Sequence, residues 1–120
     1  MKVIVCGSRD FRSPAQVWRE LDRLHAEHKF TALMQGGATG VDGFAREWAA
    51  RKPEVHRYVC HAEWDKFGKA AGPKRNARML EWKPDLVIAF PGGKGTTNMV
   101  EQAEAAGVRV LRVLEQELNK

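Results

Sequence analysis

Cysteine is scarce in this chain: only Cys6 and Cys60 occur among its 120 residues, and they form no CxxC pair. Each lies at the end of a predicted strand, so we interpret both as small buried residues rather than redox or metal-binding groups. The four histidines show no metal-ligand spacing with other ligands nearby. We therefore expect a fold that needs no disulfide, no metal and no bound cofactor.

Long hydrophobic runs, linkers, internal repeats and low-complexity segments are also lacking. The apolar run in MKVIVCGS is far too short for a signal peptide or a membrane span, which predicts a cytoplasmic protein with no membrane partner. Hydrophobic residues at 43% and charged residues at 29% are ordinary values, so we expect one folded domain over residues 1–120. The net charge of +5 suits a polyanionic partner, but the charges are spread along the chain and solubility explains them equally well.

Strand and helix patterns alternate along the chain. Short β-branched or apolar runs predict strands over residues 2–6, 31–35, 55–60, 85–90 and 108–113. Between them, helices are predicted over residues 13–28, 41–52, 73–82 and 97–106, with an ordered loop containing a short helical turn over 61–72 and a polar tail at 113–120. Such alternation within one domain predicts an α/β fold, with helices on both faces of a parallel sheet.

Glycine-rich loops follow three of the predicted strands. They are GSRDF (residues 7–11), GGATGVDG (residues 36–43) and PGGKGTT (residues 91–97), and the last precedes a helix. Glycine lets backbone N–H groups approach an anion, and a helix N-terminus adds partial positive charge. Ligands of parallel sheets bind beyond the carboxyl ends of the strands. Three such loops therefore favour a shared crevice for a phosphorylated, nucleotide-like ligand over coincidental turns.

Four motifs in a fixed order resemble a known family. They are CGSRDF, GGATGVD, AEWDKFGKAAGPKRNARML and PDLVIAFPGGKGT, within the span 2–113. This pattern resembles the YspA-like (cpYpsA-related) branch of the SLOG superfamily, which joins the SMF/DprA proteins to the LOG phosphoribohydrolases. The resemblance implies a Rossmann-like three-layer domain that binds nucleotides or nucleotide-derived ligands. It also implies a five-stranded sheet in the order 3-2-1-4-5, with the crevice between the first and fourth strands.

The resemblance to LOG enzymes breaks at one catalytic position. Those enzymes remove the base from a nucleoside monophosphate, and their Arg-x-x-x-Met and PGGxGTxxE motifs carry a catalytic Arg and Glu. Residues 75–79 match the first motif, but Met99 stands where the Glu is expected. A methionine cannot stabilise an oxocarbenium-like state as a carboxylate does. Whether the chain is an enzyme therefore stays open, and the catalytic candidates from other positions are Arg75, Asp42 and Glu63, with Asp10 and Asp65 as further carboxylates.

The predicted ligand site combines backbone, hydroxyl and cationic donors. Arg75 is the main expected phosphate cation and Arg78 a second one, although both also fit a solvated helix surface. Asp42 either bonds a ribose hydroxyl or caps a helix, and Thr96 either donates to phosphate or caps its own helix. Trp64 either stacks on a base or, as tryptophans more often do, packs in the core. The whole predicted set is Gly7, Ser8, Arg9, Gly36, Gly37, Asp42, Arg75, Arg78, Gly92, Gly93, Gly95 and Thr96.

Three functions fit these patterns. The first is a sensor or a nucleotide-processing protein that binds a nucleotide-derived small molecule. The second is a single-stranded DNA-binding protein of DprA type, with a basic cluster at residues 66–78 and with Trp64 and Phe67 as stacking platforms. The third is a LOG-like nucleoside 5′-monophosphate phosphoribohydrolase. Apolar helix faces in LOG relatives also imply a homo-oligomer.

Overall fold

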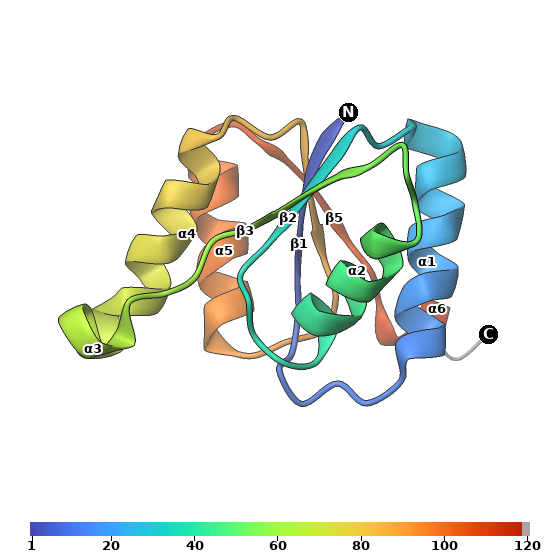
Figure 1. Ribbon diagram of the computed structural model, residues 1–120. Coiled ribbons are helices and arrows are strands. Elements are labelled where there is room, and N and C mark those ends of the chain that lie inside the picture. The colour runs from blue at the N-terminus through green and yellow to red at the C-terminus, as the bar shows by residue number, and fades with distance from the viewer. Residues whose placement is uncertain (119–120) are drawn as a thin grey trace.

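A five-stranded parallel sheet lies between two layers of helices in the computed structural model, which describes residues 1–118 (Figure 1). The strand order is β3-β2-β1-β4-β5, and each neighbouring pair is parallel. Both the sheet and its order confirm the sequence prediction. The strands are β1 (Lys2–Cys6), β2 (Ala32–Gln35), β3 (His56–Val59), β4 (Leu86–Ala89) and β5 (Arg109–Arg112).

The helices cover both faces of the sheet, as predicted. α1 and α2 lie on one face, and α4 and α5 lie on the other (Figure 1). The change of face follows from right-handed crossovers, because the chain reverses its direction across the sheet between β3 and β4. The helical elements are α1 (Pro14–His28), α2 (Val41–Ala50), α3 (Trp64–Phe67), the 3-10 turn η1 (Gly68–Ala70), α4 (Ala71–Glu81), α5 (Lys94–Ala105) and α6 (Glu115–Leu118).

The two central strands, β1 and β4, are buried on both faces. Successive strand side chains alternate between faces, so Val3 and Val5 join the larger core beneath α1 and α2. Ile4 points the other way and joins the smaller core beneath α4 and α5. Burial on both sides explains why these strands are near-continuous apolar runs. Within residues 1–118, no helix is long and apolar enough to span a bilayer.

The start of α5 differs from the sequence prediction. The helix begins at Lys94 rather than at residue 97, with Gly93 as its N-cap. Gly95 and Thr96 therefore lie in the first helical turn instead of the preceding loop. Glycines are poor helix formers, which is why the sequence pattern favoured a later start.

The predicted polar tail also differs from the structure. Residues 115–118 form α6, and Leu118 is buried against the larger core together with Val113. The side chains of Gln16 and Arg19 on α1 both donate hydrogen bonds to the Leu118 carbonyl, at 3.0 Å each. These contacts hold a segment of polar composition in helical form. Residues 119–120, the end of the predicted tail, lie outside the described residues.

Candidate functional site

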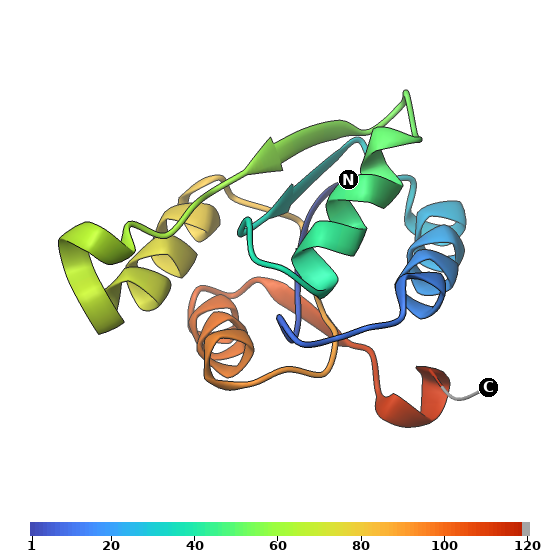
Figure 2. The ribbon, with the colours of Figure 1, turned by 60° about the horizontal axis from the view of Figure 1, so that its bottom comes forward.

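The loops after β1, β2 and β4 meet at the carboxyl edge of the sheet, which Figure 2 turns toward the viewer. The Ser8 N–H donates to the Pro91 carbonyl at 2.9 Å, and the Val41 N–H donates to the Ser8 carbonyl at 3.1 Å. The Thr39 hydroxyl donates to the Arg9 carbonyl at 2.9 Å. These bonds join all three loops into one rim.

Two glycines of the rim are required by close packing. A Cβ on Gly7 would lie 2.6 Å from Val41 Cγ2 and 2.9 Å from Phe90 Cβ. A Cβ on Gly92 would overlap Thr96 Oγ1 and lie 3.0 Å from the Ser8 nitrogen. Gly7 thus lets two loops pack over the end of the sheet, and Gly92 lets the PGGKGTT loop reach Ser8.

Gly93 and Gly95 have open surroundings. Apart from the adjoining residues and, for Gly95, the backbone of its own helix, no atom of the described residues lies within 4 Å of a Cβ built on either one. Gly93 has φ −99 and ψ −146. Close packing therefore requires neither glycine.

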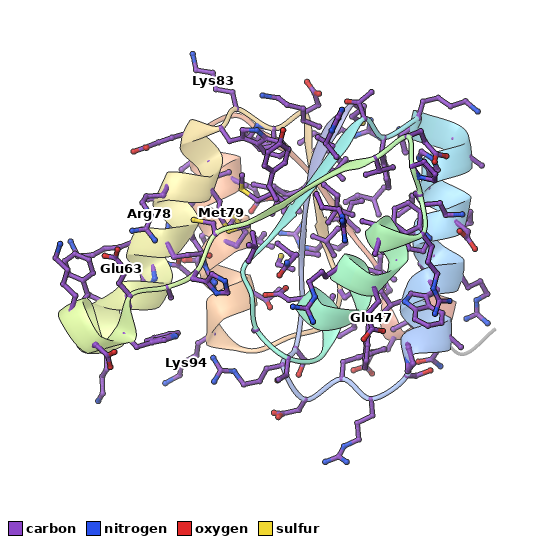
Figure 3. All side chains as sticks on the ribbon, in the orientation of Figure 1. Glu47, Glu63, Arg78, Met79, Lys83 and Lys94 are labelled. Atoms are coloured by element: carbon purple, nitrogen blue, oxygen red, sulfur yellow. The ribbon has the colours of Figure 1, made fainter. Side chains whose placement is uncertain are left out.

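The PGGKGTT loop and the start of α5 form one wall of a cleft of about 350 Å³. Gly93 provides no side-chain cap, so the leading N–H groups of α5 have no capping partner within residues 1–118. Lys94, which the sequence reasoning omitted, lies at this helix start (Figure 3). Thr96 is not the N-cap and so does not cap its helix. The lining residues of this cleft, here called the phosphate-loop cleft, are Cys6, Gly7, Ser8, Arg9, Asp10, Ala38, Asp42, Gly93, Lys94, Gly95 and Thr96.

Arg75 lies beside this cleft and is held by neighbouring groups. Its Nη1 donates to the Gly36 carbonyl at 2.7 Å, and its Nε donates to Asn76 Oδ1 at 2.9 Å. The buried Asn76 in turn donates to the Gly95 carbonyl at 3.2 Å and to Asn98 Oδ1 at 3.1 Å. Arg75 is thus tied both to the loop after β2 and to α5. The sequence reasoning missed Asn76, because only the packing of α4 on α5 buries it.

Asp42 supports the loop that precedes its own helix. Its side chain is 6% exposed, and Oδ2 accepts a hydrogen bond from the Ala38 N–H at 3.2 Å. Burial raises the pKa of Asp42 above its ordinary value, against the opposing effects of the Ala38 hydrogen bond and the Arg75 charge. The N-cap of α2 is Gly40, so the expected capping role is not seen.

Cys6 lines the phosphate-loop cleft as a free thiol. Burial, followed by the nearby Asp42 charge, raises the pKa of Cys6 to about 12. A thiol with this pKa stays protonated at neutral pH and is a poor nucleophile. Among residues 1–118, no three His, Cys, Asp or Glu side chains cluster as a metal site.

Arg78 points away from the phosphate-loop cleft. Its Nη2 donates to the His61 carbonyl at 2.8 Å, and its Nη1 lies 3.7 Å from Glu63 Oε2. Figure 3 shows the Glu63 and Arg78 side chains on the same side of α4. Arg78 was predicted to bind phosphate and Glu63 was a catalytic candidate. Their contacts instead hold the residues just before the segment formed by α3 and η1. This segment, residues 64–70, projects from the body of the molecule and is called the hook below (Figures 1 and 2).

A second cleft, of about 370 Å³, lies between the hook and the loop after β2. Trp64 at the start of the hook is 50% exposed, so its interpretation as a core residue is wrong. This Trp64 cleft adjoins the phosphate-loop cleft, because Arg9 and Ala38 line both. Its lining residues are Arg9, Gly36, Gly37, Ala38, Thr39, His61, Ala62, Trp64 and Arg75.

Met99, at the position of the LOG glutamate, is 1% exposed and lies in the smaller core. Its neighbours in that core include Ile4, Met79 and Val87. The side chain therefore faces the sheet and not the cleft. A carboxylate at this position would be buried among apolar groups.

Comparisons with known proteins identify the family of this chain. The YspA, cpYpsA-related SLOG family (YAcAr) matches residues 1–67, more than half of the chain. The chain is also similar to the Gene 61 protein of Mycobacterium phage D29, with 36% identity over 121 residues. That similarity covers 92% of this chain and 94% of the phage protein. The chain therefore belongs to the YspA, cpYpsA-related SLOG family.

Proposed function

We propose that this protein binds a nucleotide or nucleotide-derived phosphorylated ligand at the carboxyl edge of its sheet, as a sensor or in nucleotide processing. The observation that carries the proposal is the phosphate-loop cleft, where the N-terminus of α5 opens without a side-chain cap. Unsatisfied N–H groups and the helix dipole at such an end favour an anion. Membership of a SLOG family supports nucleotide-related binding.

The side chains around this helix end add complementary charge. Lys94 and Arg9 line the cleft, and Arg75 lies beside it. Ser8 Oγ accepts a hydrogen bond from the Asp10 N–H at 3.0 Å, which leaves its own hydroxyl proton available for a ligand. We place the phosphate against Gly92, Gly93, Gly95 and Thr96, with Arg75 as its principal arginine partner.

Binding without base release fits this site better than LOG-type hydrolysis. Met99 is buried, and Glu63 faces Arg78 rather than the phosphate-loop cleft. Asp42 accepts a hydrogen bond from the loop backbone, so Asp10 is the cleft-lining carboxylate that such a reaction would have to use. We expect little or no free base from 5′-AMP or related monophosphates, as followed by chromatography over hours. Robust release that Arg75→Ala abolishes would show that another carboxylate performs the reaction.

A thermal-shift panel of nucleotides tests the binding proposal. A ligand at ~100 times its Kd should raise the free energy of unfolding by about 2.7 kcal/mol. Gly95→Ala should abolish the shift without lowering the melting temperature of the free protein, because the added Cβ has open space and alanine favours a helix. Gly43→Ala, whose Cβ makes only an ordinary 3.7 Å contact, is the matched control and should bind normally. No shift with any phosphorylated nucleoside would contradict the proposal.

A nucleic-acid strand is the second candidate ligand, because the hook carries the exposed Lys66 and Lys69 as well as Trp64. However, the Lys66 and Lys74 ammonium groups lie 5.1 and 4.8 Å from the Phe67 ring centroid. Cations therefore already lie over the Phe67 ring, and Trp64 is the more open of the two predicted stacking platforms. Binding of oligo(dT) that falls steeply with salt and is weakened by Lys69→Ala would favour this candidate.

A further inference from the structure

We infer that the Trp64 cleft binds the nucleobase of the ligand, with the Trp64 indole as its stacking surface and the phosphate in the adjoining phosphate-loop cleft. This inference rests on the proposed function and assigns the base-recognition part of the same site. The Trp64 cleft, at about 370 Å³, lies within the size range of small-molecule sites. Arg9 and Ala38 line both clefts, so one ligand can occupy both.

The placement of Trp64 is unusual for a large aromatic side chain. Half of its surface is exposed, although burial of an indole is strongly favourable. One edge of the ring is nevertheless supported, because a Cβ on Gly72 of α4 would lie only 3.3 Å from Trp64 Cη2. The indole thus rests closely on the backbone of α4 and contributes to the cleft wall. A partly exposed aromatic wall is the arrangement on which a base stacks.

The wall opposite the hook supplies polar groups for a base edge. Gly37 has φ +79, and a Cβ there would overlap the His61 ring. The His61 imidazole therefore lies directly on the Gly37 backbone, at the lining of the cleft. Arg75 uses two N–H donors on Gly36 and Asn76, and the guanidinium has five. An imidazole and the remaining guanidinium donors can orient a heteroaromatic ring that stacks on Trp64.

The hook is also anchored at the point that sets the position of Trp64. Glu63, the residue before Trp64, lies 3.7 Å from Arg78, and Arg78 donates to the His61 carbonyl at 2.8 Å. These two contacts tie both sides of Ala62 to α4. The stacking residue is therefore held by α4, and Arg78 acts as a positioning residue for it.

The test compares ligands with and without a base. The probes are 5′-AMP, 5′-GMP, 5′-CMP and 5′-UMP, and ribose 5-phosphate as the base-free probe, each titrated by calorimetry. Trp64→Ala should lower the affinity for the tightest-binding mononucleotide by roughly 5- to 150-fold, the range expected for loss of one stacked base. The same variant should leave ribose 5-phosphate binding unchanged. Trp64→Phe should restore most of the nucleotide affinity, and Lys69→Ala, on the same hook, should have no effect.

The possible outcomes distinguish this inference from the proposed function. Suppose that ribose 5-phosphate binds, and that Trp64→Ala changes the affinities for the mononucleotide and for ribose 5-phosphate equally or changes neither affinity. The base site is then overturned while the phosphate site stands. If neither the mononucleotides nor ribose 5-phosphate bind the unaltered protein, both are overturned. Binding confined to oligonucleotides and lost in Lys69→Ala would also overturn it, in favour of a nucleic-acid surface. Trp64→Leu, which keeps an apolar side chain but has no aromatic face, gives the same test should Trp64→Ala fold poorly.

Discussion

The PGGKGTT loop and the hook flank adjoining clefts, but they are built from different kinds of contact. The loop is held by backbone atoms, as in the bond from the Ser8 N–H to the Pro91 carbonyl. The hook is held by side chains, through the Arg78 contacts with His61 and Glu63 and the packing of Trp64 on Gly72. Substitutions that add atoms should therefore disturb the loop, whereas substitutions that remove side-chain atoms should disturb the hook.

The two regions also differ in what lies beneath them. Phe90, just before the loop, and Met99 on α5 are each 1% exposed. In contrast, α3 and η1 have no buried residue. Segments with few buried contacts open locally at low free-energy cost. We expect the loop to unfold only with the whole domain, whereas the hook can open alone.

The largest expected effect comes from disturbing the core below the loop. Met99→Glu places a carboxylate among apolar side chains and should lower the free energy of unfolding by about 3–5 kcal/mol at neutral pH. Protonation removes the buried charge, so the deficit should shrink as the pH is lowered. Urea denaturation measures both effects. Met99→Leu keeps a similar side-chain volume and should lower the free energy of unfolding by under about 1.5 kcal/mol. A Met99→Glu protein as stable as the unaltered one would mean that residue 99 faces the cleft.

Arg75→Ala sharpens the comparison because Arg75 lies between the two clefts. We expect Arg75→Ala to weaken the binding of a phosphorylated nucleoside by about 1.5–3 kcal/mol, the value of a charge-assisted hydrogen bond. The unphosphorylated nucleoside should lose less, since only the contact of Arg75 with the base is then missing. Calorimetric titrations with 5′-AMP and adenosine measure the difference. Equal losses for the two ligands would remove Arg75 from the phosphate site.

Gly92→Ala tests whether the loop is intolerant of added atoms. The new Cβ would overlap Thr96 Oγ1 and approach the Ser8 nitrogen, so we expect a loss of about 1–3 kcal/mol in the free energy of unfolding. Gly93→Ala is the matched control, because its Cβ meets open space. Thermal denaturation compares the pair. The same stability for both variants would show that the contact of the loop with Ser8 relaxes freely.

The smallest effect is expected at the hook. Arg78→Ala removes a partly exposed ion pair and one hydrogen bond, which should cost at most about 1 kcal/mol of global stability. Amide hydrogen exchange over residues 61–70 should nevertheless become faster, because the side-chain anchor is lost. Arg112→Ala, which breaks an exposed pair with Glu104, should leave that exchange unchanged. If exchange in the hook is the same in both variants, Arg78 does not hold it.

The alternation of patterns was sufficient to predict the sheet, because strand and helix periods depend on local sequence and crossovers have one hand. The meeting of the glycine loops followed from the same rule, since all parallel strands end on one edge. The start of α5 was not predictable in this way, because Gly93 and Gly95 weaken the local helix signal while the tertiary fold imposes it.

Burial was the harder property to predict for individual side chains. Hydrophobicity favoured a core position for Trp64, but exposure depends on which element covers a residue, and the hook carries Trp64 outward. Asn76 is the converse case, a polar residue buried because α5 packs on α4 and supplies two acceptors. Both outcomes depend on contacts between segments distant in sequence, which periodicity does not encode.

The central position of β1 has a consequence for the order in which the molecule is made. The Lys2 N–H donates to Asp85 across 83 chain positions, and the Ser8 contact with Pro91 spans a similar distance. Contacts of such high sequence separation form late and slow the folding rate. A nascent chain on the ribosome therefore has no phosphate-loop cleft until β4 and the start of α5 have emerged.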